Sequence, residues 1–236
     1  MVERFYFPQL SDGPAAELSG AEARHLVKVL RKNVGDEVVL FDGRGHRATA
    51  AVVEMDKRSV RLQILARQDA ESEQSTSLVL ATAVPKGERF RWLVEKATEL
   101  GVDRLVPLET ARSVVHPGDG KLEKMEQTVI AACKQSNRDR LMAIDAKTSW
   151  QDFVANEFPG RRVYVAHPTG APCNQVVDEP GAIDAIIAAV GPEGGFDDRE
   201  IAMAVNAGAL LVNLGPQTLR IETAALAMAA TLRLTR

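Results

Sequence analysis

The sequence predicts a chain of two parts, a small and mostly β domain followed by an α/β domain with a mainly parallel sheet. Short extended stretches separated by turn residues fill the first 70 residues. The stretch 68–77 is polar and contains no hydrophobic residue larger than alanine, which is typical of a linker. Beyond it, strand-like and helix-like segments alternate, which favours a parallel sheet flanked by helices. We therefore expect domains at residues 1–70 and 78–236, joined by a linker at 71–77.

In the first domain, we expect one short helix among several strands. Ser19 and Glu22 have the spacing of a capping box, which predicts a helix that continues to about Lys32. The first strand begins near Arg4. The extended stretches that follow the helix are residues 37–43, 46–54 and 59–67.

In the second domain, buried-type strands alternate with amphipathic segments. The predicted strands are residues 78–84, 104–110, 161–167, 182–190 and 210–215. The predicted helices are residues 86–101, residues 120–141, a segment that starts near Asp197 and the alanine-rich end of the chain.

Composition narrows the possible functions. Of the 236 residues, 45% are hydrophobic, and the net charge is −3, so any nucleic-acid contact depends on a local basic patch. Cys133 and Cys173 lie far apart and in no metal-binding spacing, and we expect two reduced thiols. Neither a signal peptide nor an apolar run of bilayer length occurs, so we expect a cytoplasmic protein that binds no membrane.

Two loops near the end of the chain, each between a predicted strand and a predicted helix, are the strongest indication of a ligand site. The glycine loop runs from Gly191 to Phe196, and the second loop covers residues 214–223. Glycine lets backbone groups approach a ligand, although a tight turn alone would also explain the first loop. Neither loop has the spacing of a dinucleotide fingerprint or of a P-loop. Arg220 is the one cation of the second loop and suits an anionic or carbonyl group, unless it pairs with Glu222.

Basic residues of the first domain suggest a phosphate-contacting patch. Arg24, Lys28 and Arg31 share one face of the predicted helix, and His25 flanks that face. A solvated helix face explains the same pattern, because acidic residues balance the charge of this half. Further along the chain, single arginines and His167 are weak indications by themselves, and no metal-ligand set is evident.

Six motifs occur in an order that resembles one family. They are HLVKVLR at 25–31, KGERFRWLVEKATELGV at 86–102, ARSVV at 111–115, QSNR at 135–138, GPEGGF at 191–196 and LRIETAALA at 219–227. Together they are similar to the 16S ribosomal RNA (uracil-N3) methyltransferases, which belong to the SPOUT class of knotted, S-adenosylmethionine-dependent enzymes. The resemblance covers the whole chain.

The resemblance implies a PUA-like RNA-binding β-barrel, a knotted methyltransferase domain, a homodimer, and 16S ribosomal RNA or the small ribosomal subunit as substrate. It implies no metal. For this reaction we predict that Arg220 and Glu222 are catalytic: Arg220 offsets developing negative charge, and Glu222 orients Arg220 or takes part in proton removal. The implied S-adenosylmethionine-binding residues are Ala166, His167, Gly191, Glu193, Gly194, Gly195, Leu214, Gly215, Leu219 and Thr223. The resemblance also favours RNA contact by the basic residues of the first domain. The predicted RNA-binding residues are Arg4, Arg24, His25, Lys28, Arg31 and Arg44, together with Arg112 and Arg138 of the later loops.

The sequence departs from the family pattern at Gln217 and Ile221, where one cation and one hydroxyl are missing. Two other functions remain alternatives. One is a non-catalytic RNA-binding ribosome-assembly factor on the same fold. The other is a dinucleotide-dependent enzyme, which the missing fingerprint disfavours.

Overall fold

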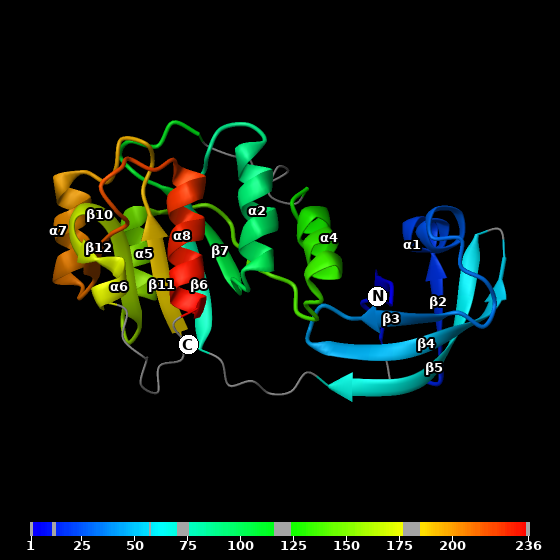
Figure 1. Ribbon diagram of the computed structural model, residues 1–236. Coiled ribbons are helices and arrows are strands. Elements are labelled where there is room, and N and C mark those ends of the chain that lie inside the picture. Colours follow the sequence, from blue (N-terminus) through cyan, green and yellow to red (C-terminus); the bar gives the residue numbers. More distant parts are fainter. Residues whose placement is uncertain are drawn as a thin grey trace. The chain divides into compact units, whose positions relative to one another are not determined.

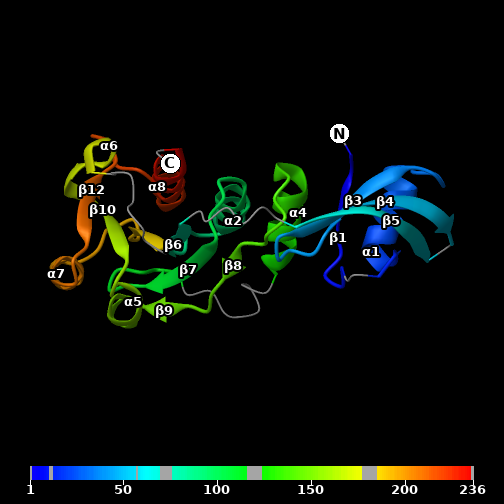
Figure 2. The ribbon, with the colours of Figure 1, turned by 90° about the horizontal axis from the view of Figure 1, so that it is seen from below.

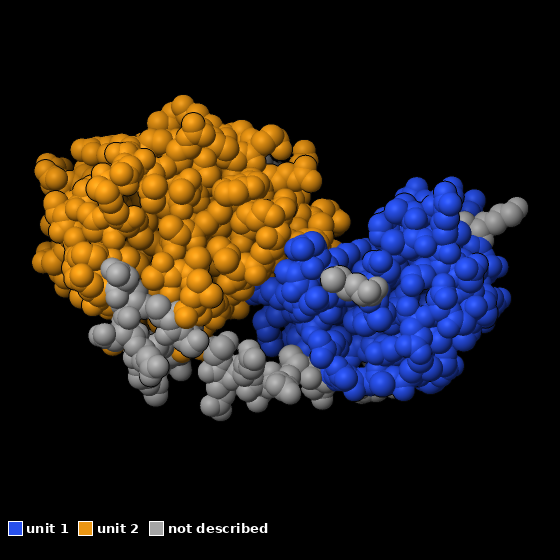
Figure 3. All heavy atoms as spheres, in the orientation of Figure 1, with its two compact units in different colours: residues 1–74, 133–141 blue, residues 75–132, 142–236 orange. Residues whose placement is uncertain are grey.

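The computed structural model describes residues 2–10, 13–56, 58–69, 76–115, 124–176 and 185–234 (Figure 1). The chain forms two compact units, which Figure 3 shows in different colours. Unit 1 comprises residues 1–74 and 133–141, and unit 2 comprises residues 75–132 and 142–236. A short segment from the middle of the sequence therefore belongs with the amino-terminal unit. Most of the predicted linker, residues 71–75, lies outside the described residues.

Unit 1 is built on a curled five-stranded sheet, as the mostly β prediction requires. The strands, in their order across the sheet, are β1 (Arg4–Tyr6), β3 (Glu37–Phe41), β4 (His46–Met55), β5 (Ser59–Asp69) and β2 (Ala15–Ser19). β1 pairs with β3 in parallel, and the other pairs are antiparallel. Alternate residues face one core, in which Phe5, Leu26, Leu40 and Leu62 are fully buried.

The helix of unit 1 differs from its prediction. It begins as α1 (Gly20–Arg24) and continues as a π-helical turn, η1 (His25–Val29). The predicted capping box is wrong, because the Ser19 side chain makes no capping hydrogen bond. Glu22 instead forms an ion pair with Lys134. Arg31 has a φ of 52°, which ends the helix before Lys32.

Unit 2 has the predicted parallel sheet. Its strands, in spatial order, are β12 (Leu210–Asn213), β10 (Arg162–Pro172), β11 (Ala185–Val190), β6 (Ser77–Ala83), β7 (Arg104–Glu109) and β8 (Ala143–Ile144). The short strand β9 (Thr148–Ser149) also pairs with β7. Every pair is parallel. The two-residue strands β8 and β9 were not predicted.

Helices flank this sheet on both faces (Figure 2). They are α2 (Arg89–Glu99), α5 (Trp150–Glu157), α6 (Cys173–Val176), α7 (Asp198–Asn206) and α8 (Ile221–Leu234). A further helix, α4 (Glu126–Ser136), begins in unit 2 and ends in the segment 133–141 of unit 1. α2 and α8 pack together, and α8 lies on β6 and β11, while α5 packs with α7 and covers β7. α4 is shorter than predicted, and residues 116–123, where that prediction began, lie outside the described residues. α5 was not predicted.

Ion pairs connect β7 to the segment after β8 and to the end of α5. The guanidinium of Arg104 on β7 donates to Asp145 at 2.7 Å and to both carboxylate oxygens of Glu157 at 3.0 and 2.7 Å. The hydrogen bonds from Arg104 hold the pKa of Glu157 below its ordinary value.

Among the described residues, no helix is both long and apolar enough to span a bilayer.

Candidate active site

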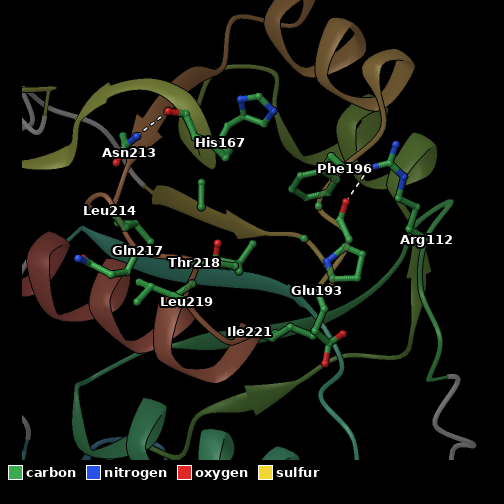
Figure 4. A pocket seen from close by; sticks show the side chains of 18 of the residues that line it. Arg112, His167, Glu193, Phe196, Asn213, Leu214, Gln217, Thr218, Leu219 and Ile221 are labelled. Carbon is green, nitrogen blue, oxygen red and sulfur yellow. Dashed lines mark hydrogen bonds between the residues drawn. The ribbon is translucent and has the colours of Figure 1, made fainter.

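A cavity of about 580 Å³ opens at the carboxyl ends of β10, β11 and β12 (Figure 4). Open α/β sheets bind ligands at this edge, because the loops that leave neighbouring parallel strands converge there. The lining residues come from segments 166–168, 190–198 and 213–224, with Arg112 from the loop after β7.

The glycine loop, which follows β11, is shaped by close contacts and by a tight turn. A Cβ atom on Gly191 would lie 3.0 Å from Cδ2 of Phe196. Gly195 has a φ of 69°, which an L-residue rarely adopts. The buried ring of Phe196 lies 4.3 Å from the ring of Trp150, so the end of the loop is anchored in the core.

The segment after Ala166 is a bulge in β10 rather than a separate loop. Both Ala166 and Ala171 pair with Val212 of β12, so the residues between them project from the sheet. His167, in this bulge, lines the cavity, and its Nδ1 lies 2.8 Å from the hydroxyl of Thr169. The bulge therefore supplies the third wall of the cavity.

Asn213 joins this bulge to the second loop, and the sequence analysis missed it. Its Nδ2 donates to the carbonyl of Pro168 at 2.5 Å, and its Oδ1 accepts from the amide of Gly215 at 2.7 Å (Figure 4 shows the first bond). Gly215 has a φ of 118°. An asparagine two residues before a glycine at a strand end is typical of a side-chain-stabilised turn. This pattern in the sequence could have identified Asn213 as a residue that shapes the second loop.

The structure brings together most of the predicted cofactor-binding residues. All of them line the cavity except Thr223, which is exposed on α8. Gln217 and Ile221, where the sequence departs from the family pattern, also line it. Their roles in binding stay predictions.

The two predicted catalytic residues lie on either side of Ile221 and do not line the cavity themselves. Arg220 is exposed and forms no ion pair with any described residue, so it is not the partner of Glu222. Glu222 is 5% exposed, and its Oε1 lies 3.6 Å from Nη1 of Arg89 on α2. Its Oε2 is buried without a hydrogen-bond partner in the described part of the chain.

The predicted RNA-binding residues fall into three environments. Arg24, His25, Lys28, Arg31 and Arg44 are exposed on unit 1. Arg112 belongs to unit 2, where it lines the cavity and donates from Nη1 to the carbonyl of Gly194 at 2.6 Å.

Arg4 and Arg138 lie in a third environment. Arg4 is only 8% exposed, because its guanidinium pairs with Asp139 and lies 5.0 Å from the ring centroid of Phe41. It also donates to the carbonyl of Arg138, whose side chain is half-buried. Arg4 therefore acts within unit 1, and we leave it out of the proposed RNA-binding set.

Arg44 is presented by a turn that Asp42 organises. The buried Asp42 carboxylate accepts from the amides of Arg44 at 2.7 Å and His46 at 3.1 Å, and it lies 2.7 Å from the His46 ring. Burial alone would raise the pKa of Asp42, but these hydrogen bonds outweigh it and lower the pKa.

Across the described residues, no three His, Cys, Asp or Glu side chains are placed to hold a metal ion.

Comparison with known proteins agrees with this arrangement. Residues 72–233 match the RNA methyltransferase domain family, and residues 18–65 match the RNA methyltransferase PUA domain family. Ribosomal RNA small subunit methyltransferase E from Mycobacterium bovis is 32% identical over 94% of this chain and 87% of its own. The protein of the same name from Bacillus subtilis is 28% identical over 92% of this chain and 89% of its own.

Two solved structures are also similar over nearly their whole length. One is a ribosomal RNA small subunit methyltransferase E from Neisseria gonorrhoeae bound to S-adenosylmethionine, with a TM-score of 0.89 and 30% identity over 99% of this chain and 98% of that chain. The other is a putative methyltransferase from Legionella pneumophila in complex with the same cofactor, with a TM-score of 0.86, 30% identity and the same coverage. The family resemblance found in the sequence is thus confirmed. This chain belongs to the ribosomal RNA small subunit methyltransferase E family, with a PUA domain followed by a SPOUT-type methyltransferase domain.

Proposed function

We propose that the protein transfers a methyl group from S-adenosylmethionine to N3 of a uridine in the 16S RNA of the small ribosomal subunit. The observation that carries this proposal is the cavity at the carboxyl edge of the sheet, where the glycine loop, the β10 bulge and the second loop meet. The family membership of the chain supports the same reaction class, and relatives with this fold are known with the cofactor bound.

The cavity residues fit this cofactor in size and in chemistry. A cavity of about 580 Å³ lies within the range of roughly 300–1,000 Å³ that small-molecule sites occupy. A Cβ atom on Gly191 or Gly194 would contact a neighbouring side chain at 3.0 or 3.2 Å, so these positions expose backbone where a side chain would crowd the wall. We propose that backbone groups of the glycine loop and of Leu214 and Gly215 hold the adenosine part, and that His167 contributes from the bulge.

Bound S-adenosylmethionine supplies an electrophilic methyl group on a sulfonium sulfur. The protein's task is to align the uracil N3 and to favour its deprotonated form, because the protonated N3 is a poor nucleophile. We assign the stabilising positive charge to Arg220, which is exposed next to the cavity wall and has no carboxylate partner among the described residues. Glu222, buried beside Arg89, either orients the start of α8 or accepts the proton.

RNA binding is proposed for the exposed cations of unit 1. A chain of net charge −3 needs such a local patch, and Arg24, Lys28, Arg31 and Arg44 are all exposed. Because N3 takes part in base pairing, the target uridine has to be unpaired or flipped out before it can react. Arg112 at the cavity would then contact the target base or a flanking phosphate.

Several further features of this proposal rest on the sequence or on the family resemblance. They are a homodimeric state, a knot in the backbone of the second domain, a domain boundary near residues 71–77 and a cytoplasmic location. Each stays a prediction. The homodimer can be tested by light scattering of the purified protein.

The experiment that tests the function is mass spectrometry of nucleosides from small-subunit ribosomal RNA, taken from cells with and without the gene. Loss of 3-methyluridine, restored by the wild-type gene and not by an Arg220→Ala variant, would support the proposal. Unchanged 3-methyluridine would refute it. A non-catalytic assembly factor would bind the RNA but release no heat with S-adenosylmethionine in calorimetry.

A further inference from the structure

Glu200, in the first turn of α7, accepts hydrogen bonds from two different loops, one at each of its carboxylate oxygens. Its Oε2 accepts from the amide of Asp197 at 2.8 Å, which completes the capping box of α7. Its Oε1 accepts from the amide of Ala111 at 2.8 Å, in the loop that follows β7. The side chain is 8% exposed, so both bonds form away from solvent, where an unsatisfied amide is costly.

The residue after Ala111 completes a second connection between the same loops. Arg112 donates from Nη1 to the carbonyl of Gly194 at 2.6 Å (Figure 4). A Cβ atom on Gly194 would lie 3.2 Å from Cδ of Arg112. The missing side chain at Gly194 therefore lets the arginine lie across the glycine loop, within the cavity wall.

We propose that Glu200 is a positioning residue for methyl-donor binding. It holds the loop after β7 against α7, so that Arg112 lies on Gly194 and fixes the backbone of the glycine loop. This inference rests on the proposed function, since it concerns binding of S-adenosylmethionine in the same cavity. It explains why a carboxylate suits this position: both partners of Glu200 are N–H donors, and only an ionised carboxylate offers an acceptor oxygen to each.

The test is calorimetric binding of S-adenosylmethionine to the full chain and to four variants. Glu200→Gln keeps the shape of the side chain but turns one of its two acceptors into a donor. Arg112→Gln removes the contact on Gly194, and Gly194→Ala displaces the arginine by crowding its Cδ. For each of the three we expect the dissociation constant to rise about tenfold, as for the loss of one hydrogen bond to a charged group. The fourth variant combines Glu200→Gln with Arg112→Gln, and its loss should be no larger than that of the weaker-binding single variant, because both act through one contact.

A matched control is Asp197→Ala, which removes the bond from the Glu200 amide to Asp197 Oδ1 but leaves the link to Ala111. The substitution removes only the N-terminal cap of α7, so it weakens the same end of the helix. We expect the affinity of this variant for S-adenosylmethionine to stay within about twofold of the wild-type value. Melting temperatures of all variants separate loss of folding from loss of binding. If Glu200→Gln does not fold, Arg112→Gln and Gly194→Ala still report on the contact.

Three outcomes overturn the inference. They are wild-type affinity in a folded Glu200→Gln variant, losses that multiply in the double variant, and an equal loss in Asp197→Ala. Failure of the proposed function looks different, because the wild-type protein itself would then bind no S-adenosylmethionine.

Discussion

Replacement of Gly170 by alanine should separate the two strands that form one side of the cavity. Gly170 lies in the bulge of β10, close to the backbone of Leu211 and Val212 in β12. A Cβ atom there would lie 2.4 Å from the nitrogen of Val212, 2.5 Å from the carbonyl carbon of Leu211 and 2.6 Å from its oxygen. All three are backbone atoms, so no change of rotamer relieves the overlap.

The size of the effect follows from these contacts. Overpacking costs about 1–3 kcal/mol, and the backbone position of the overlap places this change near about 3 kcal/mol. Movement of β12 also breaks the bond between Asn213 and the carbonyl of Pro168, which adds about 1 kcal/mol. The sum, about 4 kcal/mol, is a large part of a typical stability of about 5–15 kcal/mol. At roughly 2–4 °C per kcal/mol for a chain of this size, Tm should fall by about 8–16 °C.

Differential scanning calorimetry of the wild type and the variant measures this shift. The matched control is Gly208→Ala, where φ is 90° and no atom lies within 4 Å of the added Cβ. Backbone strain alone should cost the control about 1–2 kcal/mol. If the Gly170 variant loses no more stability than the Gly208 variant, the close approach of β10 and β12 does not limit this position and the reasoning is wrong.

Three further predictions concern charge. Arg104 lowers the pKa of Glu157 in the folded state, so the stability that this pair contributes is present above the unfolded value of about 4.3 and is lost as pH falls through the lower folded pKa. Glu157→Gln should therefore lower Tm at pH 7, and the difference from wild type should shrink at about pH 3; an equal difference at both pH values would exclude the charge as its cause. Arg220→Ala should reduce kcat by about a hundredfold with little change in Tm or in S-adenosylmethionine affinity, and an unchanged rate in single-turnover assays would remove its catalytic role. Joint replacement of Arg24 and Lys28 by alanine should weaken RNA binding and flatten its salt dependence by about one unit for each cation, measured by filter binding at several salt concentrations, and an unaltered slope would contradict the proposed patch.

The elements that were predicted well are those whose sequence pattern matches their environment. The central strands β6, β7 and β11 of unit 2 are buried on both faces, so they appear in the sequence as short apolar runs. The loops after β11 and β12 are marked by glycine and proline. The edge of the sheet where the ligand cavity lies followed directly from their parallel order.

The features that were missed depend on partners distant in the sequence. Ser19 and Glu22 have a capping-box spacing, but Glu22 pairs with Lys134, and no local pattern reveals that competitor. In the same way, Glu222 pairs with Arg89 rather than with Arg220. Asn213 acts between a bulge and a turn, and the bulge itself is visible only in the pairing of β10 with β12. Local sequence patterns indicate which interactions a side chain can make, and tertiary packing determines which of them form.

The close contact between the rings of Trp150 and Phe196 gives the protein a built-in fluorescent reporter. The chain has two tryptophans, and the other, Trp92, is 46% exposed on α2. A Trp92→Phe variant would leave a single buried indole, 4.3 Å from the residue that ends the glycine loop. Emission from that indole would report a ligand-induced change in the surroundings of Phe196 in real time, without any attached dye.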